Sequence, residues 1–160
     1  MSTGYSKNSM IRRVQVIADF QFGTGTGPRL FSEEVSFILS STGRVRQVLL
    51  DGRRIGTVRA SDGRITLGWE GARRLHGILS PPSYRVVIRD DVTEVVAEGK
   101  NVFARHVVSA DPAIRAGDEV LVVDAGDALV ATGSAILSGE EMLSFNYGAA
   151  VKVRHGRSPQ

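Results

Sequence analysis

The sequence has 160 residues, of which 42% are apolar and 23% charged, which is the composition of a globular chain with one domain or two small ones. It has no cysteine, which excludes disulfides, thiol catalysis and a thiolate zinc site. The net charge of +3 is unevenly divided, because residues 1–83 carry +6 and residues 84–160 carry −3. The apolar runs are far shorter than the roughly 20 residues of a membrane span, and the first seven residues lack the apolar core of a secretory signal. We therefore expect a cytoplasmic protein with no membrane association.

The first half of the sequence predicts an α+β domain that begins with a helix. Apolar residues recur at three- and four-residue spacing, which predicts an amphipathic helix over residues 8–22 that ends at Gly23. We interpret the glycine-rich segment 23–28 as a flexible connector, since a phosphate-binding glycine loop would follow a strand. Short β-prone runs separated by X-Gly turns then predict an antiparallel meander, followed by a helix over 70–78. The expected strands are 35–40, 45–50, 55–60 and 65–69.

Paired prolines mark a change in the chain. Pro81 and Pro82 cannot continue a helix and give a short, stiff, extended link. We therefore place a domain boundary there, with one domain over residues 1–83 and a second over residues 84–160.

The second half alternates short strands with two short helices. Asp91 is expected to cap a helix over 92–98 that Gly99 ends, and Ser138 is expected to cap a helical turn over 139–145. Short strands that alternate with two short helices within about 75 residues are typical of a small closed or nearly closed β-barrel. The expected strands are 84–89, 102–108, 119–123, 128–136 and 149–154.

Several motifs of the second half resemble those of a PUA domain. They are EGKNVFAR at 98–105, ADP at 110–112, RAGDEVLVV at 115–123, GSA at 133–135, SGEEML at 138–143 and GAAVKVRHG at 148–156. They are most similar to the PUA domain at the C-terminus of archaeal tRNA-guanine transglycosylase, the archaeosine enzyme. IADFQFG at 17–23, STGRVR at 41–46 and RASDG at 59–63 resemble the domain that precedes it. The resemblance implies an α+β pre-PUA domain followed by a mixed β pseudobarrel that binds RNA.

The resemblance implies that, in the enzymes of that family, these domains grip tRNA while an N-terminal barrel exchanges a guanine of the tRNA. This sequence lacks that barrel, its nucleophilic aspartate and its cysteine-rich zinc site. We therefore expect a non-catalytic RNA-binding chain with no cofactor and no metal. One hypothesis is an accessory module or subunit that holds tRNA for a separate catalytic transglycosylase chain. The other is a PUA adaptor that binds ribosomal RNA or a protein partner in ribosome biogenesis or translation.

The family's RNA contacts lie in the loop after the first PUA helix and along the last strand. The resemblance assigns these roles to Gly99, Lys100, Asn101, Phe103 and Arg105, and to Lys152 and Arg154. We add His106, which follows Arg105. Alternation along the last strand predicts that Lys152 and Arg154 share one face, so replacing both should weaken RNA binding and leave the melting temperature nearly unchanged. The alternative is that these charges only solvate a strand face, that Gly99 is a helix cap and that Phe103 belongs to the core.

The basic half offers a second candidate surface. Arg44 and Arg46 alternate along one predicted strand, and Arg53, Arg59 and Arg64 lie on neighbouring turns and strands. One face of the meander could therefore present several guanidinium groups to phosphates. The alternative is an ordinary solvated face. We interpret the paired arginines of the two helices as solvated: Arg12 with Arg13, and Arg73 with Arg74.

Overall fold

The computed structural model describes residues 6–158, so residues 1–5 and 159–160, the outer ends of the two expected domains, lie outside it. The chain forms two compact units, one ending at Ile78 and the other beginning at Leu79. Between residues 6 and 158, no helix has both the length and the apolar character needed to cross a bilayer.

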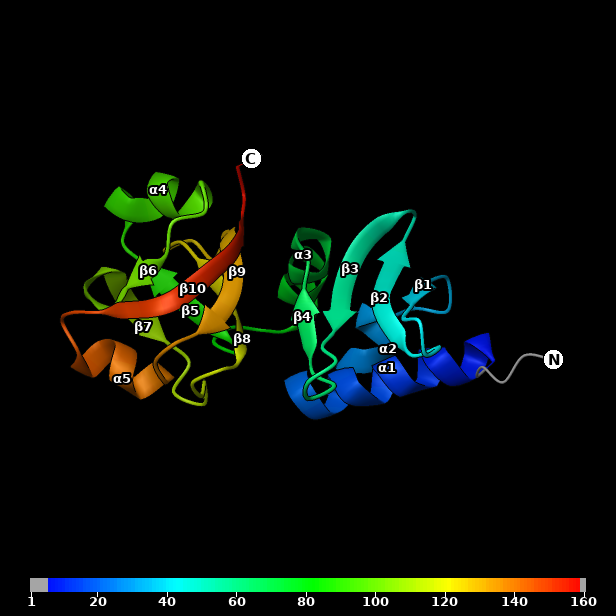
Figure 1. The fold of residues 1–160 in the computed structure, drawn as a ribbon. Helices are drawn as coiled ribbons and strands as arrows, with labels where there is room; N and C mark the ends of the chain where they lie inside the picture. Colours follow the sequence, from blue (N-terminus) through cyan, green and yellow to red (C-terminus); the bar gives the residue numbers. More distant parts are fainter. Residues whose placement is uncertain (1–5, 159–160) are drawn as a thin grey trace. The chain divides into compact units, whose positions relative to one another are not determined.

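The first unit packs helices against a four-stranded antiparallel meander (Figure 1). Helix α1 (Lys7–Phe22) begins after Ser6, whose Oγ accepts a hydrogen bond from the backbone N–H of Ser9, and ends at Gly23, as expected. The sheet has the order β1-β2-β3-β4, and helix α3 (Trp69–Ile78) follows its last strand. The strands are β1 (Ser36–Leu39), β2 (Val45–Leu50), β3 (Arg53–Val58) and β4 (Ile65–Leu67). Fully buried apolar side chains from helices and sheet form its core: Val14, Ala18, Leu30, Phe31, Ile55 and Leu75.

The segment predicted as a flexible connector contains a helical turn, α2 (Thr26–Leu30), so that prediction was wrong. The backbone N–H of Gly27 donates to Asp19 Oδ1 at 2.6 Å, which joins α2 to α1. A Cβ at Gly27 would lie 2.1 Å from the backbone oxygen of Gln15. Glycine is therefore needed here because two backbones approach closely, and not because the segment must flex.

The second unit is a six-stranded, mixed, nearly closed barrel, which confirms the expected pseudobarrel (Figure 1). The strand order is β6-β10-β9-β8-β5-β7, and every neighbouring pair is antiparallel except β5 with β8. The strands are β5 (Arg85–Ile88), β6 (Val102–Phe103), β7 (Val107–Ala110), β8 (Glu119–Val123), β9 (Leu129–Ala135) and β10 (Ala149–Gly156). Two short helices, α4 (Thr93–Ala97) and α5 (Gly139–Ser144), complete the unit. Its core is a single cluster made mostly of valine, isoleucine and alanine side chains.

The strand expected over 102–108 is divided in two. A 3-10 turn, η2 (Ala104–His106), separates β6, which pairs with β10, from β7, which pairs with β5. The chain thus passes from one edge of the sheet to the other within three residues, and this passage nearly closes the barrel. The β-prone composition hides the break, because strand propensity does not specify which strands pair.

The two predicted helix caps of this unit had opposite outcomes. Asp91 does not cap α4: its carboxylate pairs with Arg89 at 2.7 Å, and a 3-10 turn, η1 (Asp90–Val92), leads into the helix. Ser138 caps α5 as predicted. Its Oγ accepts a hydrogen bond from Glu141 N at 3.2 Å, and Glu141 Oε1 accepts one from Ser138 N at 2.9 Å, which completes a capping box.

Candidate nucleic-acid interface

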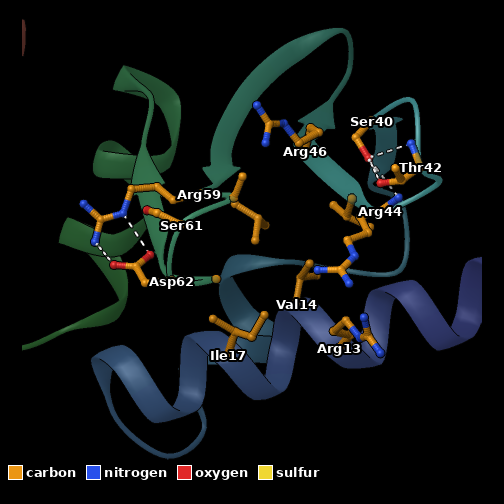
Figure 2. A pocket seen from close by; sticks show the side chains of 14 residues that line it. Arg13, Val14, Ile17, Ser40, Thr42, Arg44, Arg46, Arg59, Ser61 and Asp62 are labelled. Atoms are coloured by element: carbon orange, nitrogen blue, oxygen red, sulfur yellow. Dashed lines mark hydrogen bonds and ion pairs between the residues drawn. The ribbon is translucent and has the colours of Figure 1, made fainter.

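Arginines line a groove of about 640 Å³ in the first unit, between α1, the β1–β2 turn, β2 and the segment after β3 (Figure 2). Apolar side chains of α1 and the sheet form part of the lining: Val14, Ile17, Val45 and Val58. The arginines of the lining are Arg13, Arg44, Arg46 and Arg59. An apolar surface bordered by guanidinium groups suits the sugar and phosphate parts of a nucleic acid.

The turn and the strand place Arg44 and Arg46 by different means. Arg44 lies directly before β2, and its backbone N–H donates to Ser40 Oγ at 3.2 Å. At Arg46 the register between β1 and β2 shifts, so this residue occupies a β-bulge. Both side chains are exposed, and neither has an acidic partner within residues 6–158.

Arg59 is held beside the groove by an ion pair with Asp62 (Figure 2). Its Nε donates to Asp62 Oδ1 at 3.1 Å, and its Nη2 contacts Oδ2. The backbone N–H of Arg64, which donates to Asp62 Oδ1 at 3.0 Å, lowers the pKa of Asp62 from its ordinary value, and Arg59 lowers this pKa as well. Because the Asp62 carboxylate stays ionised, Arg59 adds less net positive charge to the groove than Arg44 or Arg46.

The basic face expected from the sequence is only partly formed. Arg59 joins Arg44 and Arg46 at the groove, whereas Arg53 lies elsewhere and pairs with Glu70 at 3.4 Å. Arg64 does not line the groove. Arg13, which we interpreted as part of a solvated helix face, is exposed and also lines the groove. Its position beside the buried Val14 could have placed Arg13 at the border of the face that packs on the sheet.

In the second unit, two lysines extend from adjacent backbone segments. Asn101 Oδ1 accepts a hydrogen bond from Val153 N at 3.0 Å, which ties the loop after α4 to β10. Lys100 precedes Asn101, and Lys152 precedes Val153. Both lysines are exposed, and in the described part of the chain neither forms an ion pair. This arrangement places two exposed lysines on adjacent segments of a unit whose overall charge is negative.

The backbone around Gly99 is already hydrogen-bonded. Gly99 has a φ of +109°, and its N–H donates to Val96 O at 2.9 Å. The N–H of Lys100 donates to Val95 O at 3.3 Å. These bonds satisfy carbonyl groups at the end of α4, which favours the interpretation of Gly99 as a helix cap over a direct phosphate contact.

Arg154 differs from its neighbour Lys152. The register between β10 and β9 shifts at Arg154, so this residue occupies a β-bulge, although it is exposed like Lys152. Its Nη1 and Nη2 donate to the two carboxylate oxygens of Glu119 at 2.8 and 2.6 Å, and Glu119 is only 3% exposed. This bidentate pair engages Arg154 within the barrel and leaves less of its guanidinium group for a phosphate.

The turn η2 carries a cluster of aromatic and cationic side chains. Phe103 is 38% exposed and therefore not part of the core. The Arg105 guanidinium carbon lies 5.3 Å from the centroid of the Phe103 ring, and the His106 ring meets that ring edge-on at 5.6 Å. Burial, and then the charges of Arg105 and Arg89, lower the pKa of His106 from its ordinary value, which favours a neutral imidazole at neutral pH.

Comparison with known proteins assigns both units. Residues 12–82 match the patch-forming domain C2 of tRNA-guanine transglycosylase, and residues 84–157 match the PUA domain. The tRNA-guanine(15) transglycosylase of Pyrococcus abyssi is 50% identical over 153 residues, which are 96% of this chain and 26% of that enzyme. This is a PUA-domain protein that resembles the C-terminal part of archaeal tRNA-guanine transglycosylase. We refer to residues 12–82 as the C2 domain and to residues 84–157 as the PUA domain.

Other relatives give the same assignment for the C2 and PUA domains. The tRNA-guanine(15) transglycosylase of Methanothermobacter thermautotrophicus is 46% identical over 145 residues, or 90% of this chain and 22% of that enzyme. The chain thus spans about a quarter of the length of these relatives, and the similarity covers their C-terminal, non-catalytic part.

Solved structures share the fold at lower sequence identity. A hypothetical protein from Pyrococcus horikoshii has a TM-score of 0.73 and 23% identity, with 98% of this chain and 94% of that chain covered. A conserved PUA domain protein from Thermoplasma acidophilum has a TM-score of 0.63 and 20% identity, with 98% and 93% covered. At these identities the likeness concerns the fold alone.

Proposed function

We propose that this chain binds tRNA as an accessory module or subunit of transglycosylase-type tRNA modification and is not catalytic by itself. The observation that carries the proposal is the 50% identity, over nearly the whole chain, to the C-terminal part of an enzyme named for tRNA-guanine exchange. The absence of cysteine from the sequence supports the non-catalytic part, because the zinc site of the family uses cysteines. A separate catalytic transglycosylase chain, in the cytoplasm, would be the natural partner.

We assign the phosphate contacts of this proposal to two surfaces. In the C2 domain they come from Arg44 and Arg46, which are exposed and line the groove. In the PUA domain they come from Lys100, Lys152 and Arg105, which are exposed. Four further residues shape the PUA surface and support these contacts: Gly99, Asn101, His106 and Arg154. We also propose residues 1–83 and 84–160 as the functional domains, supported by the family matches that end at residue 82 and begin again at 84.

Salt dependence of tRNA binding tests the C2 part of the proposal. Fluorescence anisotropy with labelled tRNA should give an affinity that falls steeply with salt, with a logarithmic slope of about −0.7 to −0.9 per neutralised phosphate. Replacing Arg44 and Arg46 by Gln should weaken binding and reduce the slope by about 1 for each residue. The matched control removes two positive charges outside the groove, with Arg12→Gln and Arg29→Gln, and should change the slope much less.

Two results would contradict this function. One is a wild-type chain that does not bind tRNA even at low salt. The other is an equal loss of affinity in the groove variant and in its control, which would show that only net charge matters. Tighter binding to ribosomal RNA fragments than to tRNA would favour the adaptor hypothesis instead.

A further inference from the structure

Two exposed aromatic side chains of the PUA domain take no part in the surfaces described above. Phe145 and Tyr147 lie between α5 and β10, with ring centroids 6.1 Å apart and ring planes at 13°. Phe145 is 39% exposed and Tyr147 is 73% exposed. An exposed tyrosine ring that is already aligned by a stacked phenylalanine loses little conformational freedom when a further planar group stacks on it.

The backbone holds this aromatic pair beside η2. The chain leaves α5 with Phe145 as its C-cap, and Gly148 O then accepts a hydrogen bond from Ala104 N at 2.9 Å. One residue later, Ala149 pairs with Phe103 across β10 and β6. The segment that carries Phe145 and Tyr147 is therefore attached to the turn that carries Arg105.

A guanidinium group and aromatic planes on neighbouring segments indicate the chemistry of the ligand. Unpaired nucleotides combine a flat π-surface, which stacks on aromatic rings, with an anionic phosphate, which an arginine neutralises. Arg105 already lies over one aromatic ring, that of Phe103, at 5.3 Å. The positive charge of Arg105 favours a nucleotide over an apolar protein segment, which would bring no charge to pair with it.

On the basis of the proposed RNA binding, we infer that the open face of Tyr147 stacks on an unpaired base of the bound RNA. Phe145 holds the Tyr147 ring in place, and Arg105 neutralises a phosphate next to the stacked base. The PUA domain would then distinguish RNA with an unpaired nucleotide from fully paired RNA, whereas the lysines respond to any phosphate.

Affinity measurements with Tyr147→Ala in the 160-residue chain test this inference. Loss of one base–aromatic stack should weaken tRNA binding by about 5- to 150-fold. Tyr147→Phe keeps the aromatic face and should bind within about twofold of the wild type. Leu143→Ala is the matched control, because Leu143 is a 54% exposed apolar side chain on α5 near the same segment. Tyr147→Ala and the wild type should bind a blunt RNA duplex with equal affinity.

The outcomes separate this inference from the function on which it rests. If the wild type binds tRNA and Tyr147→Ala binds it equally well, the stacking role is wrong while tRNA binding stands. An equal loss for the blunt duplex would also overturn the inference, since a duplex has no unpaired base to stack. Loss of a captured protein partner with tRNA affinity unchanged would assign the pair to a protein interface. A wild-type chain that binds no RNA would overturn both proposals.

Discussion

At the scale of single residues, the two cations of β10 should behave differently when they are replaced. Arg154→Ala removes the bidentate partner of Glu119, which is 3% exposed. Its cost should lie toward the lower end of the roughly 3–5 kcal/mol seen when one partner of a buried ion pair is removed, because the Arg154 side chain is itself 32% exposed. Lys152→Ala should change the free energy of unfolding by less than about 0.5 kcal/mol while weakening RNA binding. Urea denaturation measures the free energy of unfolding of both variants.

This prediction replaces the one made from alternation alone, in which loss of Lys152 and Arg154 together left the melting temperature nearly unchanged. A variant that combines Glu119→Gln with Arg154→Ala gives the control, because it no longer leaves an ionised carboxylate without its arginine. It should recover part of the lost stability. Equal stability of Arg154→Ala and Lys152→Ala would show that the ion pair contributes nothing.

His106 should titrate below its ordinary pKa of 6.5, because burial and then Arg105 and Arg89 disfavour its charged form. The unfolded chain binds the proton of His106 more readily than the folded chain does. The neutral His106 side chain therefore contributes to the stability of the fold, fully above pH 6.5, and this contribution is lost as pH falls through the folded-state pKa. An NMR titration of the imidazole measures the His106 pKa directly. Arg105→Gln removes one positive neighbour and should raise the His106 pKa. A wild-type pKa at or above 6.5 would contradict the environment described here.

At the scale of elements, the contact between α1 and α2 depends on a residue without a side chain. An added Cβ at Gly27 would lie 2.1 Å from Gln15 O, so Gly27→Ala should separate the helices and cost about 1–3 kcal/mol or more. Gly77→Ala in α3 is the control, because nothing lies within 4 Å of its added Cβ. It should be neutral or stabilise by about 0.5–1 kcal/mol. Thermal unfolding followed by circular dichroism compares the two, and equal melting temperatures would contradict the close approach.

The elements that the sequence predicted well are those specified by local pattern. The apolar spacing of α1 and the X-Gly turns of the meander lie within short windows, and so does the capping box at Ser138. The misses depend on contacts between distant residues. The helical turn α2 packs against Gln15, and the break at η2 depends on which strands β6 and β7 join. The bulges at Arg46 and Arg154, and the ion pair of Arg154 with Glu119, also depend on residues that are distant in the sequence.

At the scale of the whole molecule, the two units should be able to fold separately, because each has its own buried core. Residues 79–160 expressed alone should unfold cooperatively and give a well-dispersed amide spectrum. The spectrum should include slowly exchanging amides in β8 and β9, where every residue but Leu129 and Ser134 is buried. A fragment with collapsed amide dispersion would contradict this expectation.

The candidate interface was predictable to different depths on the two units. The motifs at 98–105 and 148–156 led to the right fold of the PUA domain, because the resemblance carries positions directly. In the basic unit, charge counting indicated a phosphate-binding face but could not choose its members. Arg53 and Arg73 both pair with Glu70. Arg13 lines the groove, and only the packing of α1 on the sheet shows that it does.

The position of β10 has a consequence for biosynthesis. It is the last strand within residues 6–158, yet it lies inside the sheet, between β6 and β9. On the ribosome, the first unit can therefore be finished while the second still waits for residues 149–156. A chain released before Ala149 would lack the strand that joins β6 to the rest of the barrel, and β9 would be left as an open edge that can pair with another chain. Termination of translation before residue 149 should accordingly yield a product with one sound domain and one prone to aggregate.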